Sequence, residues 1–297
     1  MLDSAALLTV YDSQLRDKAE VSSALTWQRH GPLIWATYIA GRGFVTYREL
    51  PDDAAVNALV KATINHFSGN PHISAVEWKT RGHDPVSDLP PILRAHAFVA
   101  GDVESVMMGE ARALAVDVPL PAGVTIRRVC SEADVRRMCA MQAEVFDSDP
   151  EDDNTEAILH QLALGQNDLE LWVAEAAGMI VCAGRLEPIP GTVVAGIWGG
   201  CTRAEWRGRG IYRALTAERA RSALRRGCSI LHSDSTESSR PILQRSGFTK
   251  VTTTTPYRWR RSPATQARLI STRRPRGDLR RIRGKPPPGF SRVGDLM

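Results

Sequence analysis

The stretch CTRAEWRGRGIYRAL, residues 201–215, follows an apolar segment and leads into a helical pattern. It places Gly208 and Gly210 directly before Ile211 and Leu215, which begin an apolar helical face. Glycines let backbone N–H groups converge at the start of a helix, where the donors of the first turn have no intrahelical partner. We interpret the segment as a cradle for an anionic group, and the alternative is a basic turn in solvent.

The residues around this segment alternate between apolar strands and amphipathic helices, which predicts an α+β fold around a mixed sheet. A turn at Ala177-Gly178 divides the segment 169–189 into two strands. Gly199 and Gly200 interrupt the next strand, 192–202, and indicate a bulge or a close approach of a ligand to the backbone. The other expected elements are helices over 131–146, 156–165, 211–226 and 239–246, and strands over 124–129, 228–234 and 248–255.

An internal repeat indicates that the chain contains two copies of one unit. PILRAHAF (91–98) and PILQRSGF (241–248) are offset by 150 residues, and each follows a strand-like run. Together with the proline-containing segment 116–123, the repeat predicts domains over 1–115 and 124–257, joined by that segment as a linker. The same offset places residues 52–65 opposite the glycine loop, and they contain neither glycine nor arginine. We therefore expect only the second copy to bind an anion.

Charge is distributed unevenly along the 297 residues. From Pro256 onward the chain has eleven Arg and one Lys against Asp278 and Asp295, although the whole chain has a net charge of only +5. The body is therefore acidic, and residues 258–297 are expected to form a flexible basic tail. No apolar run reaches the length of a membrane span, no secretory leader is evident, and the five cysteines lack metal-ligand spacing. These features predict a cytoplasmic protein without a membrane or metal partner.

With these elements in place, the second half resembles the GNAT superfamily of N-acetyltransferases. Arg207 and Gly210 match the family's acyl-CoA-binding pattern, whereas Tyr212 departs from its last position. RPILQRSGF (240–248) resembles the family's penultimate helix and the Gly-Phe turn after it. The resemblance implies two GNAT-like α+β domains, each a mixed, mostly antiparallel sheet flanked by helices, with the first copy degenerate.

The resemblance also implies the acyl donor, acetyl-CoA, and the residues that would contact it. Its pantetheine arm would pair with the backbone of Cys201, Thr202 and Arg203. Its pyrophosphate would lie on the backbone N–H groups of the following loop. The loop residues are Arg207, Gly208, Arg209, Gly210, Ile211 and Tyr212.

Candidate residues for proton transfer are less distinctive. Many family members have a tyrosine as the acid at the position of Leu243, so the resemblance supplies no acid here. Glu187, at the end of an expected strand, and Glu144, on an expected helix, are the candidate bases, and the alternative for each is an exposed carboxylate without a catalytic role. His232 and Asp234 share one face of a strand, where a histidine usually serves packing. The cluster EWKTRGHD (77–84) suggests no particular chemistry.

Three functions remain open at this point. The first is transfer of an acetyl or other short acyl group from CoA to a primary amine of a small molecule or peptide by direct attack. The second is binding or sensing of acyl-CoA without catalysis, as Leu243 suggests. The third is association with nucleic acid, which is expected only through the basic tail. Neither the acceptor nor a choice between monomer and homodimer follows from the sequence.

Overall fold

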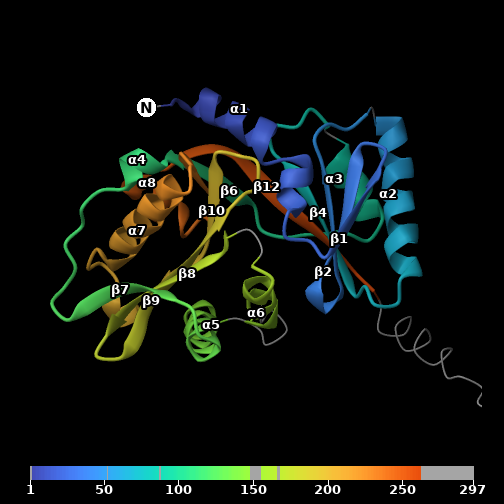
Figure 1. Ribbon diagram of the computed structural model, residues 1–297. Helices are drawn as coiled ribbons and strands as arrows, with labels where there is room; N and C mark the ends of the chain where they lie inside the picture. The colour runs from blue at the N-terminus through green and yellow to red at the C-terminus, as the bar shows by residue number, and fades with distance from the viewer. Residues whose placement is uncertain (1, 52, 87, 148–154, 166–167, 262–297) are drawn as a thin grey trace, which may run out of the picture. The chain divides into compact units, whose positions relative to one another are not determined.

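The computed structural model describes residues 2–51, 53–86, 88–147, 155–165 and 168–261. Met1–Arg261 form one compact unit. Residues 262–297, which make up most of the predicted tail, lie outside the described part of the chain. Figure 1 shows how the helices and strands of the first unit are arranged.

The elements keep the labels of Figure 1. The α-helices are α1 (Ser4–Gln14), α2 (Asp53–Gly69), α3 (Leu89–Ala95), α4 (Ala111–Leu114), α5 (Glu132–Phe146), α6 (Thr155–Ala163), α7 (Ile211–Arg225) and α8 (Arg240–Ser246). Short 3₁₀ turns are η1 (Asp17–Val21), η2 (Ile39–Gly41) and η5 (Ala204–Trp206). The strands are β1 (Thr26–His30), β2 (Leu33–Tyr38), β3 (Arg42–Tyr47), β4 (Ala75–Arg81), β5 (Val99–Ala100), β6 (Glu104–Glu110), β7 (Val124–Val129), β8 (Glu170–Ala176), β9 (Met179–Pro188), β10 (Val194–Thr202), β11 (Ile230–Ser235) and β12 (Thr249–Arg260).

The two halves of the chain repeat one order of elements, as the sequence repeat predicted. In each half an antiparallel pair leads into a third strand, a long helix and a strand parallel to the third: β3, α2 and β4 in the first half, and β10, α7 and β11 in the second. Both α3 and α8 have a proline in the first turn. Gly247 follows α8 with φ +107°, and Ala97 has φ +63° at the same place in the first copy. Because a left-handed alanine is uncommon, its presence there supports a common origin for the two turns.

The last strands of the two halves are exchanged. β12, from the second half, pairs antiparallel with β4 of the first half, while β6, from the first half, pairs antiparallel with β11 of the second. β6 and β12 also pair with each other, so the described strands form one twelve-stranded sheet in the order β1-β2-β3-β4-β12-β6-β11-β10-β9-β8-β7, with β5 beside β12. The halves therefore share their hydrogen bonds as well as their core.

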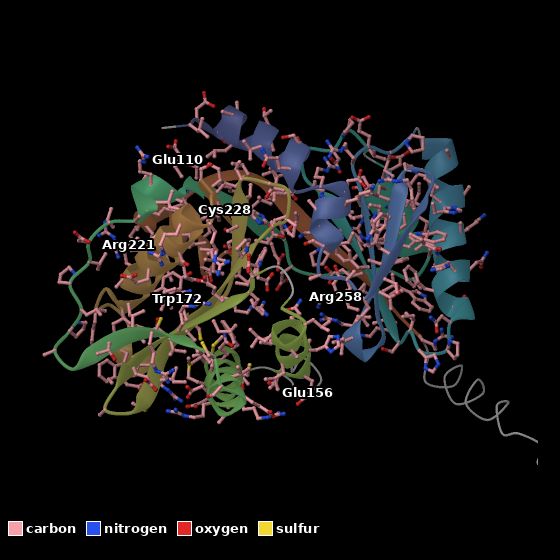
Figure 2. All side chains as sticks on the ribbon, in the orientation of Figure 1. Glu110, Glu156, Trp172, Arg221, Cys228 and Arg258 are labelled. Carbon is pink, nitrogen blue, oxygen red and sulfur yellow. The ribbon has the colours of Figure 1, made fainter. Side chains whose placement is uncertain are left out.

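The long helices that follow β3 and β10 cover the same face of the sheet. Trp78 packs beneath α2 and α3, and Trp172, labelled in Figure 2, belongs to the cluster beneath α4, α7 and α8. Alternate residues of β9, β10, β11 and β4 point to the other face, where α1, η1, α5 and α6 lie. Arg221 of α7 donates to the carbonyl of Val116, which fixes the start of the predicted linker.

The elements predicted for the second half are confirmed within a few residues. Ser131 caps α5 by accepting from the N–H of Asp134, and the glycines at 199 and 200 lie in a β-bulge. One boundary differs, because β12 continues through Arg260, which the sequence placed in the tail. These polar residues pair with β4, and Arg261 then donates to four carbonyls at the end of α2 and after it. Residues 258–260 therefore form a strand despite their mostly polar composition, because their backbone pairs with β4 of the first half.

Candidate functional site

The two parallel strands of the second half pair along only part of their length. β10 and β11 are in register from Val194–Gly196 opposite Ile230–His232. Beyond this point β10 continues to Thr202 beside β9, and β11 continues to Ser235 beside β6. Among the described strands, the β10 edge that faces β11 therefore has no partner over its second half. A free strand edge of this kind offers backbone N–H and C=O groups to an extended ligand.

A bulge bends β10 along this free edge. The register with β9 shifts between Trp198 and Cys201. Gly199, inside the bulge, has φ +60°, and its carbonyl accepts from Nε2 of Gln142 at 2.5 Å. Gly200 lies against the ring of Tyr212, where an added Cβ would come within 2.7 Å of the ring. Both glycines are therefore required by geometry.

The glycine loop connects this edge to the start of α7. Gly208 and Gly210 have φ +74° and +77°, and Gly210 is the N-cap residue of the helix. The N–H groups of the first helical turn have no intrahelical partners and carry the positive end of the helix dipole. Arg207 donates from Nε to the carbonyl of Thr202, and the Arg209 guanidinium lies 4.9 Å from the ring centre of Trp206. These contacts hold the loop in shape. The N–H of Arg207 donates to the carbonyl of Ala204, so the donors that the loop can offer a ligand are those after Arg207.

The side chains of the residues expected to meet pantetheine are engaged elsewhere. Cys201 is buried beside Met141, and burial raises the pKa of its thiol to about 12. The hydroxyl of Thr202 donates to Sγ of Cys182. Arg203 forms a two-pronged ion pair with Glu144 at 2.6 and 2.8 Å. What these positions could offer a ligand is their main chain.

The two candidate bases occupy different surroundings. Glu144 is exposed, and the hydrogen bond from Arg203 holds the pKa of its carboxyl below the usual value. Glu187 lines a cavity of about 270 Å³ together with Arg185. The remaining lining residues come from both halves of the chain: Ser23, Leu25, Tyr38, Ile39, Arg42, Ala157, Ile158, His160 and Gln161. The sequence FDSDPEDDNTE, residues 146–156, is acidic, and most of it lies outside the described residues.

Glu187 and His232 lie in one row across three strands. Gly196 of β10 is the register partner of Glu187 on one side and of His232 on the other. Directly opposite residues point to the same face of a sheet, so both side chains lie on the face that carries α1, α5 and α6. Gly196 has no side chain between them, and the indole of Trp198 lies where its Cβ would be. Sequence spacing could not reveal this row, because it depends on register.

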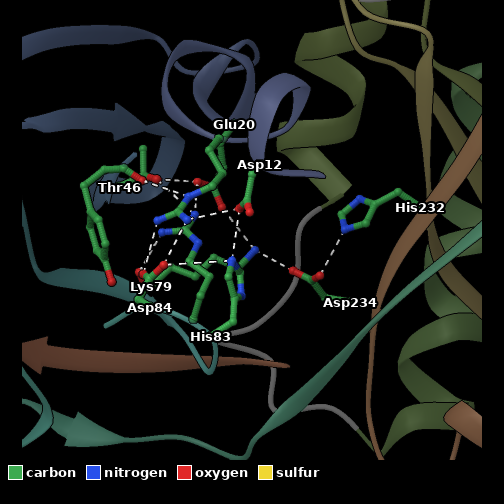
Figure 3. Close-up of polar contacts among 11 residues, drawn as sticks. Asp12, Glu20, Thr46, Lys79, His83, Asp84, His232 and Asp234 are labelled. Atoms are coloured by element: carbon green, nitrogen blue, oxygen red, sulfur yellow. Dashed lines mark hydrogen bonds and ion pairs between the residues drawn. The ribbon is translucent and has the colours of Figure 1, made fainter. Parts of the chain in front are cut away.

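A buried ion-pair network continues from this row into the first half (Figure 3). His232 Nε2 lies 3.1 Å from Asp234 Oδ1, and Lys79 Nζ lies 2.5 Å from Asp234 Oδ2 and 3.3 Å from Glu20 Oε1. Glu20 also accepts from Arg81 and Thr46. Burial alone would raise the pKa of Asp234, but the charge of Lys79 and the hydrogen bond from His232 hold it far below its usual value. The cluster at 77–84, which suggested no chemistry, thus supplies two cations to this network.

Leu243, at the position where the family often has its acid, is 2% exposed within the core beneath α7. Among the described residues no group of three His, Cys, Asp or Glu side chains could hold a metal ion. None of the described helices is both long and apolar enough to cross a membrane.

Comparisons with known proteins identify the fold. No protein-family model and no curated protein matches the sequence. Among solved structures, a GCN5-related N-acetyltransferase from Kribbella flavida aligns with a TM-score of 0.60 and 17% identity over 80% of this chain and 94% of its own. One from Sphaerobacter thermophilus aligns with a TM-score of 0.57 and 18% identity over 77% and 76%. A tandem GNAT protein from the clavulanic acid biosynthesis pathway gives a TM-score of 0.55 and 14% identity over 82% and 88%. This chain therefore has the tandem GNAT fold that the internal repeat and the motifs of the second half together predicted.

Proposed function

We propose that the chain is an N-acyltransferase that transfers an acetyl or other short acyl group from CoA to a primary amine. The amine belongs to a small molecule or peptide and attacks the thioester directly while both substrates are bound. The observation that carries this proposal is the free edge of β10, which ends in a glycine loop at the start of α7. The fold of the neighbours supports the same reaction class.

The donor would lie along the free edge of β10. The amide groups of its pantetheine arm would pair with the backbone of residues 201–203, and its pyrophosphate would accept from the N–H groups between Arg207 and Tyr212. The sequence of the first half has no glycine loop at the equivalent place. The connection from β3 to α2, residues 48–52, contains no glycine. We therefore propose one donor site, in the second half.

Replacing Gly208 by aspartate is expected to weaken acetyl-CoA binding at least about tenfold. The carboxylate would stand against the phosphates, and each charge-assisted hydrogen bond lost there costs about 1.5–3 kcal/mol. Gly191→Asp is the matched control, because Gly191 also has φ +74° and both glycines have no heavy atom within 4 Å of an added Cβ. Calorimetric titration with acetyl-CoA measures both variants. Equal affinity in the two variants would contradict the proposed phosphate site.

The acceptor amine would enter the cavity that Glu187 lines. Its carboxylate, 25% exposed and 3.9 Å from Arg185, can hold an ammonium group and accept its proton. Glu187 is also the register partner of Gly196, the last residue of β10 that pairs with β11. Glu144 instead holds Arg203 beside β10. We therefore propose Glu187 as the base and assign Glu144 a structural role.

Glu187→Gln is expected to lower kcat/KM for the amine about 10²-fold or more and to leave the affinity for acetyl-CoA unchanged. Glu144→Gln is the control, with activity near that of the native chain. Release of free thiol from acetyl-CoA across a panel of primary amines measures both variants. The reverse pattern would transfer the role of base to Glu144.

The same assay separates catalysis from sensing. Leu243 in the place of the usual acid is the observation that favours a protein that binds acyl-CoA without turnover. Such a protein would bind acetyl-CoA in the titration and release no thiol with any amine of the panel. The residues through which a nucleic acid would be bound lie mostly outside the described part of the chain.

A further inference from the structure

His232 is a buried histidine with one ring nitrogen engaged and the other free. The residue is 5% exposed, and its Nε2 faces Asp234 Oδ1 at 3.1 Å. Within the described residues, its buried Nδ1 has no hydrogen-bond partner. A buried polar atom without a partner costs free energy, so its presence calls for a functional reason.

Asp234 determines which tautomer of His232 is present. Its carboxylate is only 6% exposed and is held ionised by Lys79, whose Nζ lies 2.5 Å from Oδ2. An ionised carboxylate can only accept hydrogen bonds, so the proton of a neutral His232 is on Nε2. Nδ1 therefore presents a lone pair. Lys79 is in turn paired with Glu20, and Lys79 and Glu20 both belong to the first half of the chain.

His232 lies at the point where β10 and β11 separate. His232 is in the last register pair between β10 and β11, opposite Gly196. Tyr11 of α1 lies 5.8 Å and Trp198 of β10 lies 5.3 Å from His232 between ring centres, and Met108 of β6 is its register partner. Glu187 lies two strands away, on the other side of Gly196. Burial raises the pKa of Tyr11, which keeps that phenol neutral. The charged group in the same row as His232 is therefore Glu187, and the charged group beside His232 on its own strand is Asp234.

We propose that His232 carries a proton from the attacking nitrogen to the sulfur of the leaving CoA. The proposal rests on the acyl transfer proposed above and supplies the acid that is missing at Leu243. Asp234 and Lys79 are positioning residues, because they act by holding the imidazole. The half-buried indole of Trp198 is the group that would turn aside to admit the donor's sulfur.

The reaction moves two protons from the nitrogen, and Glu187 takes only the first, so a second group must carry the other proton to the leaving thiolate. The ammonium first gives one proton to Glu187, which returns it to water. The free amine then attacks the carbonyl carbon, so a C–N bond forms and the carbonyl oxygen becomes negative. Nδ1 of His232 takes a second proton from the nitrogen, the C–S bond breaks, and the proton passes from Nδ1 to the thiolate. His232 ends neutral, as it began, and one group serves as base and then as acid, as in catalytic triads.

The first test needs no acceptor amine, because CoA itself is the probe. With CoA bound to the full chain, Nδ1 is expected to accept the thiol proton, so the thiolate should form at a pH about one unit or more lower than in His232→Gln. The ultraviolet absorbance of the thiolate, followed against pH, measures this difference. His83→Gln is the matched control, since His83 is also a histidine with ring nitrogens engaged by side chains, those of Asp12 and Thr252, but within the described part of the chain has no hydrogen bond or ion pair with Lys79, Asp234 or His232. It should titrate like the native chain.

The second test measures turnover with the best amine of the panel. His232→Gln is expected to lower kcat about 10²- to 10⁴-fold with unchanged affinity for acetyl-CoA, and added imidazole should restore part of the rate in His232→Gly. Asp234→Asn should lower kcat in the same direction, because the amide no longer selects the tautomer. Identical thiol titrations in the native chain and His232→Gln would overturn the inference and leave the proposed function intact. A native chain that binds no CoA would overturn both.

Discussion

Replacing Lys79 by methionine is expected to lower the free energy of unfolding by about 3–5 kcal/mol. The Lys79 side chain is 16% exposed and stands between two buried carboxylates, those of Asp234 and Glu20. Methionine has a similar volume but, among the described residues, leaves His232 as the only side-chain partner of Asp234, so much of the cost of burying that charge is uncompensated. Chemical denaturation at neutral pH measures the loss. Lys61→Met, at an exposed position of α2, is the control and should change stability little.

The cost of Lys79→Met should also depend on pH. Asp234 has a pKa in the folded chain that is depressed below its unfolded value of about 3.9. Its contribution to stability is therefore present above that value and is lost as the pH falls through the folded pKa. The variant lacks this contribution, so the gap between it and the native chain should be widest near neutral pH and narrow below about pH 4. A gap that does not change with pH would mean that the loss comes from packing alone.

A chain that consists of residues 116–261 is expected not to fold. It lacks β6, so β11 loses its partner on one side, and it lacks β4, so β12 loses the strand that pairs with it from Thr254 to Arg260. Exposed strand edges favour aggregation over a stable monomer. The absence of a cooperative thermal transition, together with loss of acetyl-CoA binding, is the expected result.

The control for this experiment is the chain 1–261, which keeps every described strand. Mixing separately produced fragments 1–115 and 116–261 during refolding should recover part of the cooperative transition, because the exchanged strands can then pair. A fragment 116–261 that melts cooperatively and binds acetyl-CoA like the longer chain would contradict the prediction. That outcome would favour two domains that fold separately, as the linker at 116–123 first suggested.

Much of the fold could be predicted because it depends on local pattern. Gly208 and Gly210 before an apolar helical face indicated the loop and the helix after it, and the Pro-Ile-Leu repeat indicated duplication. The exchange of β6 and β12 could not be predicted in this way. Each strand has the same residue pattern whether it completes its own half or the other, and the choice depends on pairing between residues more than a hundred positions apart.

The candidate site divides in the same manner. The side proposed for the acyl donor could be predicted from contiguous residues, 201–212, because a loop that binds through its backbone needs glycines at fixed places in the sequence. The cavity proposed for the acceptor could not be predicted, since it combines residues of α6 and β9 with residues near β2 and β3. His232 could be identified only as a sheet-face histidine. Its free Nδ1 and its alignment with Glu187 depend on strand register and on Lys79, which lies in the other half.

The exchange of strands also sets the order of events during synthesis. β4 ends at Arg81, but its partner β12 begins at Thr249. At about 5–20 residues per second, on the order of 10–30 s pass on the ribosome between the two. Throughout that time one edge of β4 lacks the strand that pairs with it in the folded protein. β6 has been synthesised early in this interval, but its own partners, β11 and β12, have not. We therefore expect folding of both halves to be completed together, after the last strand has been synthesised.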